Sequence, residues 1–255
     1  MDATVALAGL IVGFLVGLTG MGSGSLMAPF LIFVGVRPMV AVGTDLAYAA
    51  ITKVVVAWQH HRLGTVDSGV ALHLAAGSIP ASILGVGLTV LLGQQRELAD
   101  LIVTRTLGVT VILVGVATLL RLALRHDAGG ALPRLDVKGP LAWQLVLLGA
   151  VVGFLVGITS VGSGTLVALV LLVSTPLLPR VVVGTDIFHA ALLLGAAALA
   201  HGSVGNVDVA LAGNLLVGSV PGVVLGSRLS AHLPSRALKV LLGLVLVGCG
   251  IKLLV

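Results

Sequence analysis

The chain has 255 residues and a net charge of +5, and 58% of its residues are hydrophobic while only 9% are charged. A soluble domain has about 25% charged residues, so this composition excludes a soluble enzyme, and its low polarity also excludes a disordered chain. The basic residues occur singly between apolar segments, which is typical of the loops of a membrane protein and argues against a nucleic-acid partner.

The apolar segments follow one another along the chain in two sets of four. The first set consists of residues 5–36, 39–62, 66–93 and 98–124. After a more polar stretch, the second set consists of residues 142–175, 181–202, 207–229 and 235–255. Each segment has the roughly 20 residues that a helix needs to cross a bilayer core. The sequence therefore predicts an all-α, polytopic integral membrane protein.

The two sets repeat each other. GFLVGLT at residues 13–19 matches GFLVGIT at 153–159. Further matches keep the same order: VGTD at 42–45 and 183–186, His60 and His201, a G-x-V-D run at 64–67 and 205–208, and GS(I/V)P at 77–80 and 218–221. We therefore expect two homologous halves, residues 1–126 and 141–255, joined by a connector at 127–140.

The number of crossings in each half decides whether the halves are parallel or inverted. The first segment would be about 48 Å long as one helix, longer than a core of about 30 Å, and a Gly/Ser-rich run interrupts it. If the first segment of each half, 5–36 and 142–175, turns back as a hairpin, nine basic residues lie on one side of the membrane and four on the other. If each of these two segments crosses once, the numbers are six and seven.

The positive-inside rule favours the hairpin. We therefore predict a hairpin plus three spans in each half, inverted repeats, a cytoplasmic connector and both termini outside the cytoplasm. Two short full crossings give the same parity, and the charge count does not separate them from a hairpin.

The Gly/Ser-rich runs at 20–25 and 160–165 are the first candidate site. A helix broken inside the bilayer exposes backbone N–H groups at the start of its second part, and these groups with the helix dipole attract anions. Transporters with inverted repeats place such breaks around the substrate. The alternative is that these small residues only allow close helix packing. The predicted substrate-binding residues of the two runs are Gly22, Ser23, Gly24, Ser25, Gly162, Ser163, Gly164 and Thr165.

Charged residues inside the apolar segments are the second candidate. Lys53 lies deep in its segment, where a charge is costly, and we expect it to attract the anion together with Thr44 and Thr185. The second half has Leu194 at the position of Lys53, so the halves cannot contribute equally. We predict that Asp45, Asp186 and His189 carry protons or bind a coupling cation. The alternative for the two aspartates is that they cap helix starts.

The remaining polar residues fit structural roles better. Asp67 and Asp208 follow Gly-containing turns, which predicts helix N-caps. His60 and His201 end apolar segments, where a structural role is the commoner one, although a histidine can also relay protons. The sequence has no catalytic or nucleotide-binding motif, so we expect no enzyme activity, no metal and no cofactor, and a transport process driven by an ion gradient.

The chain resembles the TauE/SafE sulfite exporter family in three sets of motifs: the Gly-rich segments at 13–29 and 153–168, the Gly-Thr-Asp runs at 43–45 and 184–186, and the His-Arg-x-Gly-x-Val-Asp run at 61–67. The resemblance covers nearly the whole chain. It implies a membrane transporter that exports small sulfur oxyanions or organosulfonates, driven by a gradient. Gly202-Ser203 stands where the first half has His61-Arg62, so we assign that pair no direct substrate role.

Together these observations predict a secondary active transporter in the cell membrane that exports sulfite or an organosulfonate by alternating access. Its expected partners are the small anion, the lipid bilayer and a coupling proton or cation, with no nucleic acid. An anion channel and a Na⁺-coupled anion importer are the alternatives. The exact substrate, the direction of transport, the coupling ion and the oligomeric state stay open at this point.

Overall fold

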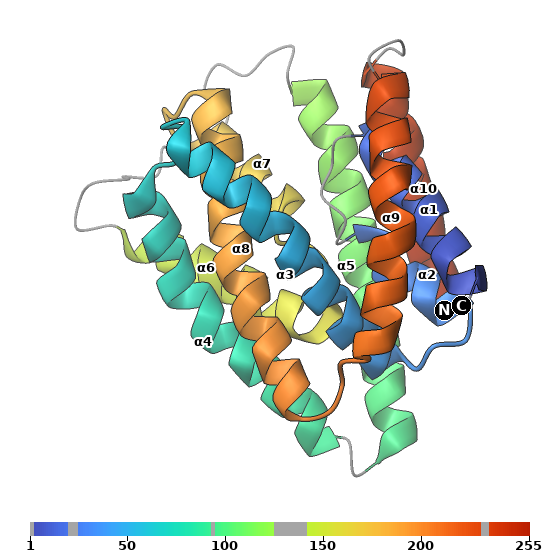
Figure 1. Cartoon of the computed structure of the whole chain (residues 1–255). Helices are drawn as coiled ribbons and strands as arrows, with labels where there is room; N and C mark the ends of the chain where they lie inside the picture. The colour runs from blue at the N-terminus through green and yellow to red at the C-terminus, as the bar shows by residue number, and fades with distance from the viewer. Residues whose placement is uncertain (1–2, 20–24, 93–94, 125–141, 231–234) are drawn as a thin grey trace.

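The computed structural model describes residues 3–19, 25–92, 95–124, 142–230 and 235–255. Within these ranges every regular element is a helix (Figure 1): α1 Ala3–Thr19, α2 Met27–Phe33, α3 Pro38–Arg62, α4 Ser68–Leu92, α5 Arg96–Leu124, α6 Trp143–Thr159, α7 Thr165–Ser174, α8 Pro179–Ser203, α9 Val209–Ser230 and α10 Ser235–Leu254. In this part of the chain, six helices are long and apolar enough to cross a membrane: α3, α4, α5, α8, α9 and α10. The prediction of an all-α, polytopic membrane protein is confirmed. The predicted connector at 127–140 lies outside the described residues.

Each half of the chain begins with a broken pair of helices, α1 with α2 and α6 with α7. The second member of each pair is short. α2 has seven residues and α7 has ten, which makes them about 10 and 15 Å long at 1.5 Å per residue. Neither described helix is long enough to cross a core of about 30 Å on its own.

The two halves interlock rather than forming separate bundles. α1 packs on α9, and its repeat equivalent α6 packs in the same way on α4; α3 packs on α8 and α5 on α10. Each of these four contacts therefore joins a helix of one half to a helix of the other. Figure 1 shows that α3 and α8 cross the bundle in opposite directions, as do α4 and α9.

Glycines make the closest of these contacts possible. A Cβ atom on Gly13 of α1 would lie 2.5 Å from the backbone oxygen of Ser219 on α9. Gly153 of α6 meets Ser78 of α4 in the equivalent way. The same pattern holds one turn to either side, at Gly9, Gly17, Gly149 and Gly157. Side chains as small as hydrogen let two backbones touch, which is how membrane helices pack closely.

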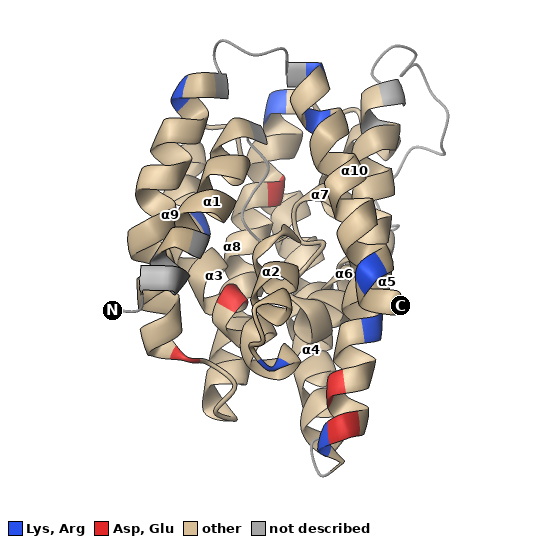
Figure 2. Ribbon diagram, turned by 90° about the vertical axis from the view of Figure 1, so that its right-hand side faces the viewer, with Lys and Arg blue, Asp and Glu red and all other residues tan. Residues whose placement is uncertain are grey.

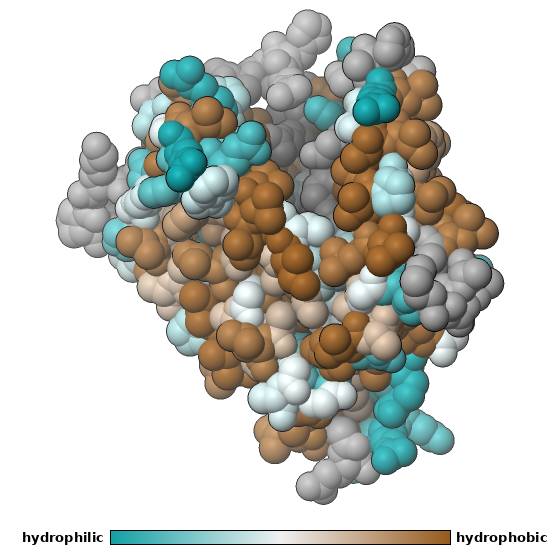
Figure 3. Space-filling model, in the orientation of Figure 1, coloured by the Kyte–Doolittle hydropathy of each residue, from teal (hydrophilic) through white to brown (hydrophobic). Residues whose placement is uncertain are grey.

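The surface of the bundle suits a lipid environment. Large apolar side chains are exposed around it, among them Leu84 (69%) and Leu199 (77%), and Figure 3 shows them spread over most of one face. Figure 2 shows several Lys and Arg at one end of the bundle, where α9 ends and α10 begins, and others farther down along α5 and α10. A soluble protein would not leave so much apolar area in water.

Candidate functional site

The second break, residues 160–164 between α6 and α7, lies inside the protein. Ser160 has a left-handed backbone conformation (φ 64°) and Gly162 has φ 109°, so the chain changes direction here. Ser160 is fully buried and Ser163 is 4% exposed. No side chain caps the start of α7, where Gly164 is the N-cap residue. The break therefore places the C-terminal end of α6 and the uncapped N-terminal end of α7 side by side in the interior.

Lys53 of α3 reaches the N-terminal end of α7. Its Nζ lies 3.3 Å from the position that a Cβ atom on Gly164 would occupy, and Oδ2 of Asp186 lies 3.7 Å from the same point. Both side chains are buried, with 9% of Lys53 and 5% of Asp186 exposed, and their charges attract each other. The glycine thus leaves room for an ammonium group, a carboxylate and the start of a helix to meet.

Asp45 of α3 reaches the other side of the break. Its carboxylate is fully buried, and Oδ2 accepts a hydrogen bond of 2.7 Å from the hydroxyl of Ser160. The backbone N–H of Ala28 in α2 also interacts with this carboxylate. Oδ1 has no hydrogen-bond partner among the described residues. The two acidic positions of the repeat, 45 and 186, therefore have different surroundings.

Asp45 and Asp186 do not cap helix starts. α3 begins at Pro38 and α8 begins at Pro179, so each aspartate lies about two turns inside its helix. The N-cap alternative for this pair is wrong because each helix starts earlier than the motif suggested.

His189 joins the group around Lys53. Its Nε2 and the hydroxyl of Ser78 on α4 share a hydrogen bond of 2.8 Å, and both side chains are fully buried. Nδ1 of His189 has no hydrogen-bond partner within the described ranges. The histidine lies close enough to Lys53 to interact with its charge. Lys53, Asp186, His189 and Ser78 thus form one buried polar cluster at Gly164.

Thr44 and Thr185 hold the backbone of the opposite half. The hydroxyl oxygen of Thr44 accepts a hydrogen bond from the N–H of Asp208 at 3.0 Å, and Thr185 accepts one from the N–H of Asp67 at 2.9 Å. The carboxylates of Asp67 and Asp208 in turn accept hydrogen bonds from the N–H groups of Val70 and Leu211. The N-cap prediction for Asp67 and Asp208 is confirmed.

His60 and His201 are held by hydrogen bonds within the fold. Nε2 of His201 donates to the carbonyl oxygen of Gly157 at 2.8 Å, and the side chain is 1% exposed. Nδ1 of His60 pairs with the hydroxyl of Thr65 at 2.9 Å. These contacts agree with a structural role for both histidines.

Of the predicted residues in the first break, the structure describes only Ser25. Gly22, Ser23 and Gly24 lie outside the described residues. Ser25 is half-buried and comes just before α2. In the second break, Gly164 lies beside the polar cluster, and its neighbours in sequence, Ser163 and Thr165, are buried. A Cβ on Gly162 would instead meet the side chains of Leu166 and Thr110.

Sequence reasoning missed two members of the site, Ser160 and Ser78. Ser160 is the first residue of the second Gly/Ser run, so a signal was present, but only the later residues of the run were selected. Ser78 belongs to the repeated GS(I/V)P motif, which could have marked it. In both cases the partner lies more than 100 residues away in sequence, and nothing local identifies it.

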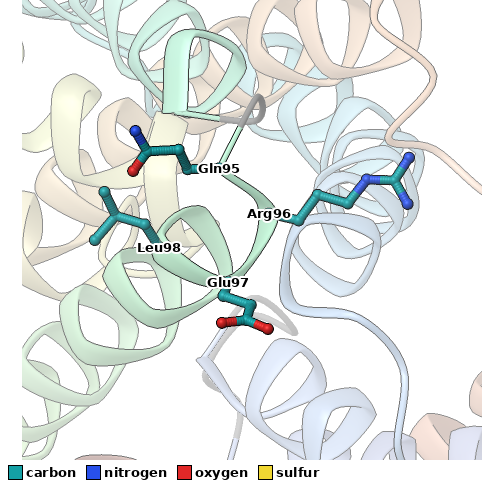
Figure 4. Close-up of a pocket in the computed structure, with 4 residues that line it drawn as sticks. All are labelled: Gln95, Arg96, Glu97 and Leu98. Atoms are coloured by element: carbon teal, nitrogen blue, oxygen red, sulfur yellow. The ribbon is translucent and has the colours of Figure 1, made fainter.

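A separate hollow lies on the surface at the start of α5. Gln95, Arg96, Glu97 and Leu98 line it, and Figure 4 shows their side chains pointing in different directions. None of the buried polar residues described above lines this hollow, and its four side chains form no convergent set of polar groups.

Comparisons with known proteins cover the whole chain. The family model described as Sulfite exporter TauE/SafE matches residues 5–253. "Probable membrane transporter protein YjnA" of Bacillus subtilis (strain 168) is 40% identical over 258 residues, covering 100% of both chains. "Probable membrane transporter protein YunE" and "Probable membrane transporter protein YdhB" of the same organism are each 26% identical, over 96% and 90% of this chain and 94% and 90% of their own. No solved structure matches the chain.

Proposed function

This chain belongs to the TauE/SafE sulfite exporter family of membrane transporters, and from that membership we propose that it exports a small sulfur-containing anion, sulfite or an organosulfonate, by alternating access. It is a multi-pass membrane protein, and we place it in the cell membrane. The proposal rests on one observation above all, the buried ammonium group of Lys53 at the uncapped start of α7.

The chemistry of this position suits an oxyanion of sulfur. Such an anion carries its charge on oxygen atoms that accept several hydrogen bonds. The free N–H groups at the start of a helix supply donors and a positive partial charge, the hydroxyls of Ser163 and Thr165 supply two more donors, and Lys53 supplies a full charge. When the anion is absent, Asp186 balances the charge of Lys53. We also retain Thr44, Thr185 and the first break, Gly22 to Ser25, as residues that surround the transport path.

Inverted repeats give a route for alternating access. The opposite courses of α3 and α8 and of α4 and α9 support inversion, and repeats of this kind rock against each other around a central site. In this proposal the halves are residues 1–126 and 141–255. The end of the bundle with the larger number of basic residues faces the cytoplasm, and the connector predicted from the sequence is cytoplasmic as well. Both termini then lie outside the cytoplasm.

An ion gradient supplies the energy in this mechanism, with Asp45, Asp186 and His189 as the candidate coupling residues. All three are buried in the interior between the two halves. A group that takes up or releases a cation there changes the charge of the site through which the anion passes.

The test is anion flux into liposomes that contain the purified protein. Sulfite, sulfate, thiosulfate, taurine and sulfoacetate are compared, with and without imposed proton and Na⁺ gradients. We expect flux of at least one sulfite- or sulfonate-class anion that saturates with concentration and depends on a gradient. We expect Lys53→Gln to abolish it and Lys53→Arg to retain part of it, because arginine keeps the charge but not the shape of the ammonium group.

Thermal unfolding of each variant in detergent is the control, since a variant that still unfolds cooperatively near the wild-type temperature has kept its fold. Unchanged flux in a folded Lys53→Gln protein would remove Lys53 from the mechanism. Flux that neither saturates nor responds to a gradient would identify an anion channel, and accumulation that requires Na⁺ on the side of entry would identify an importer.

A further inference from the structure

The two buried charged side chains of α3, Asp45 and Lys53, both contact the second break. The negative one lies at the C-terminal end of α6 and the positive one at the N-terminal end of α7. The carboxylate of Asp45 contacts Ser160, the C-cap residue directly after α6. The ammonium group of Lys53 lies beside Gly164, the residue that precedes α7. The C-terminal end of a helix carries a partial negative charge and the N-terminal end a partial positive charge. The end of α6 therefore repels the carboxylate of Asp45, while the hydroxyl of Ser160 and the N–H of Ala28 in the first turn of α2 donate hydrogen bonds to that carboxylate. The start of α7 repels the ammonium group of Lys53.

An arrangement of this kind is unfavourable for the protein alone and favourable for bound ions. A negative side chain at a negative helix end attracts a cation, just as a positive side chain at a positive helix end attracts an anion. The Lys53 side of the break is the anion site proposed above. By the same argument, the Asp45 side of the break should attract a cation. Ser160 and Gly164, the break residues on the two sides, are four positions apart in sequence.

Asp45 also lacks the compensation that its repeat equivalent has. Asp186 lies beside Lys53, whereas no basic side chain of the described residues pairs with Asp45. Its carboxylate is 0% exposed, and Oδ1 has no hydrogen-bond partner in the described part of the chain. The hydrogen bonds from Ser160 and Ala28 do not neutralise the charge. Burying an ionised carboxylate without an opposite charge costs several kcal/mol, and a ligand that carries positive charge at Oδ1 would offset this cost.

We infer that Asp45, the hydroxyl of Ser160 and the C-terminal end of α6 form a binding site for a monovalent cation, either Na⁺ or a proton. Around Asp45, α6 contributes Ser160 and α2 contributes the backbone of Ala28. The other charged and titratable groups of the interior on α3 and α8 are Lys53, Asp186 and His189, which meet near Gly164; Lys53 is eight residues from Asp45, about 12 Å along α3. That this cation is the coupling ion rests on the proposed function; that it binds does not. Of the three candidate coupling residues, this inference selects Asp45.

The experiment measures cation binding without transport. The purified full-length protein is unfolded by heat in detergent without any sulfur anion. In one arm Na⁺ replaces choline at constant ionic strength, and in the other arm the pH is lowered at constant Na⁺. Ligands that bind only the folded state raise the unfolding temperature, so we expect the wild type to be stabilised by several degrees in one of the two arms. A shift in the first arm identifies Na⁺ as the cation, and a shift in the second identifies the proton.

Variants assign the shift to the site. We expect Asp45→Asn to lose it and Ser160→Ala to reduce it, because the first removes the charge and the second one oxygen ligand. Asp100→Asn, which changes an aspartate that pairs with Arg37 away from the interior site, should keep it. If Asp45→Asn does not fold, the test compares the cation-dependent shift in unfolding temperature of Ser160→Ala with that of Asp100→Asn. We expect a smaller shift in Ser160→Ala.

The inference is overturned if neither arm separates the wild type from the Asp45→Asn and Ser160→Ala variants. It is also overturned if Asp100→Asn loses the shift equally. Because the readout needs no anion, these outcomes leave the transport proposal standing. A normal cation shift in a protein without anion flux would instead count against the transport proposal alone.

Discussion

Thr44 on α3 accepts a hydrogen bond from the backbone N–H of Asp208, the residue that caps α9 in the other half of the chain, and the two atoms are 3.0 Å apart. Thr185 and Asp67 repeat the contact with the halves exchanged. The VGTD motif of each half thus holds the G-x-V-D motif of the opposite half. These two motifs recur because one contact between the halves is made twice.

Replacing Thr44 with valine should lower the stability of the protein. Valine keeps the shape of threonine but removes the acceptor of the N–H of Asp208, and losing a hydrogen bond of this kind costs about 0.5–1.5 kcal/mol. Thermal unfolding in detergent measures the loss. Thr44→Ser is the matched control because it keeps the oxygen, and Thr185→Val should behave like Thr44→Val. Equal stability of the valine and serine variants would contradict the role of the hydroxyl.

Gly222→Ala should destabilise the protein, whereas Gly213→Ala should not. Both glycines lie in α9, but a Cβ on Gly222 would meet the backbone oxygen of Leu10 in α1, while a Cβ on Gly213 has nothing within 4 Å. Forcing a methyl group between packed backbones costs about 1–3 kcal/mol. The unfolding temperatures of the two variants provide the measurement. A similar decrease in both would show that the effect comes from the helix itself and not from its contact with α1.

His201→Leu should lower stability without altering the pH dependence of transport. The buried imidazole donates to the carbonyl of Gly157, so leucine leaves a buried acceptor unpaired at a cost of about 1–3 kcal/mol. His201→Gln should restore part of the stability, since its amide can donate in the same direction. Flux measured across a range of pH checks the second half of the prediction. A changed pH profile in a folded His201→Gln protein would indicate that the histidine relays protons.

The sequence predicted the helices and their repetition well, because apolar length and motif order are local properties. It could not show that α1 packs on α9 rather than within its own half, since that contact joins residues about 200 positions apart. The same limit explains why Ser160 was missed as the partner of Asp45. The N-cap alternative for Asp45 failed for a different reason: α3 begins at Pro38, after Arg37, with no side chain that caps its start.

Cysteine labelling should place the two ends of the bundle on opposite sides of the membrane. Leu63 follows α3 and Val34 follows α2, and they are 67% and 56% exposed. In a Cys249→Ser background, we expect a membrane-impermeant thiol reagent added outside intact cells to label Val34→Cys and not Leu63→Cys. Permeabilised cells provide the control, since both positions should then react. Labelling of Leu63→Cys from outside would reverse the orientation proposed for the protein.

Gly164→Ala should weaken anion transport while leaving the fold intact. The added methyl group would lie 3.3 Å from Nζ of Lys53 and 3.7 Å from Oδ2 of Asp186, so it partly fills the space in which the ammonium group meets the start of α7. Lys53 is flexible enough to move aside, and we therefore expect a raised KM for the anion, by about tenfold for a loss of 1.4 kcal/mol, with little change in unfolding temperature. Gly195→Ala is the matched control, because a Cβ at that position in α8 has no atom within 4 Å. If the two alanine variants transport the anion with the same KM, the anion does not bind at the start of α7.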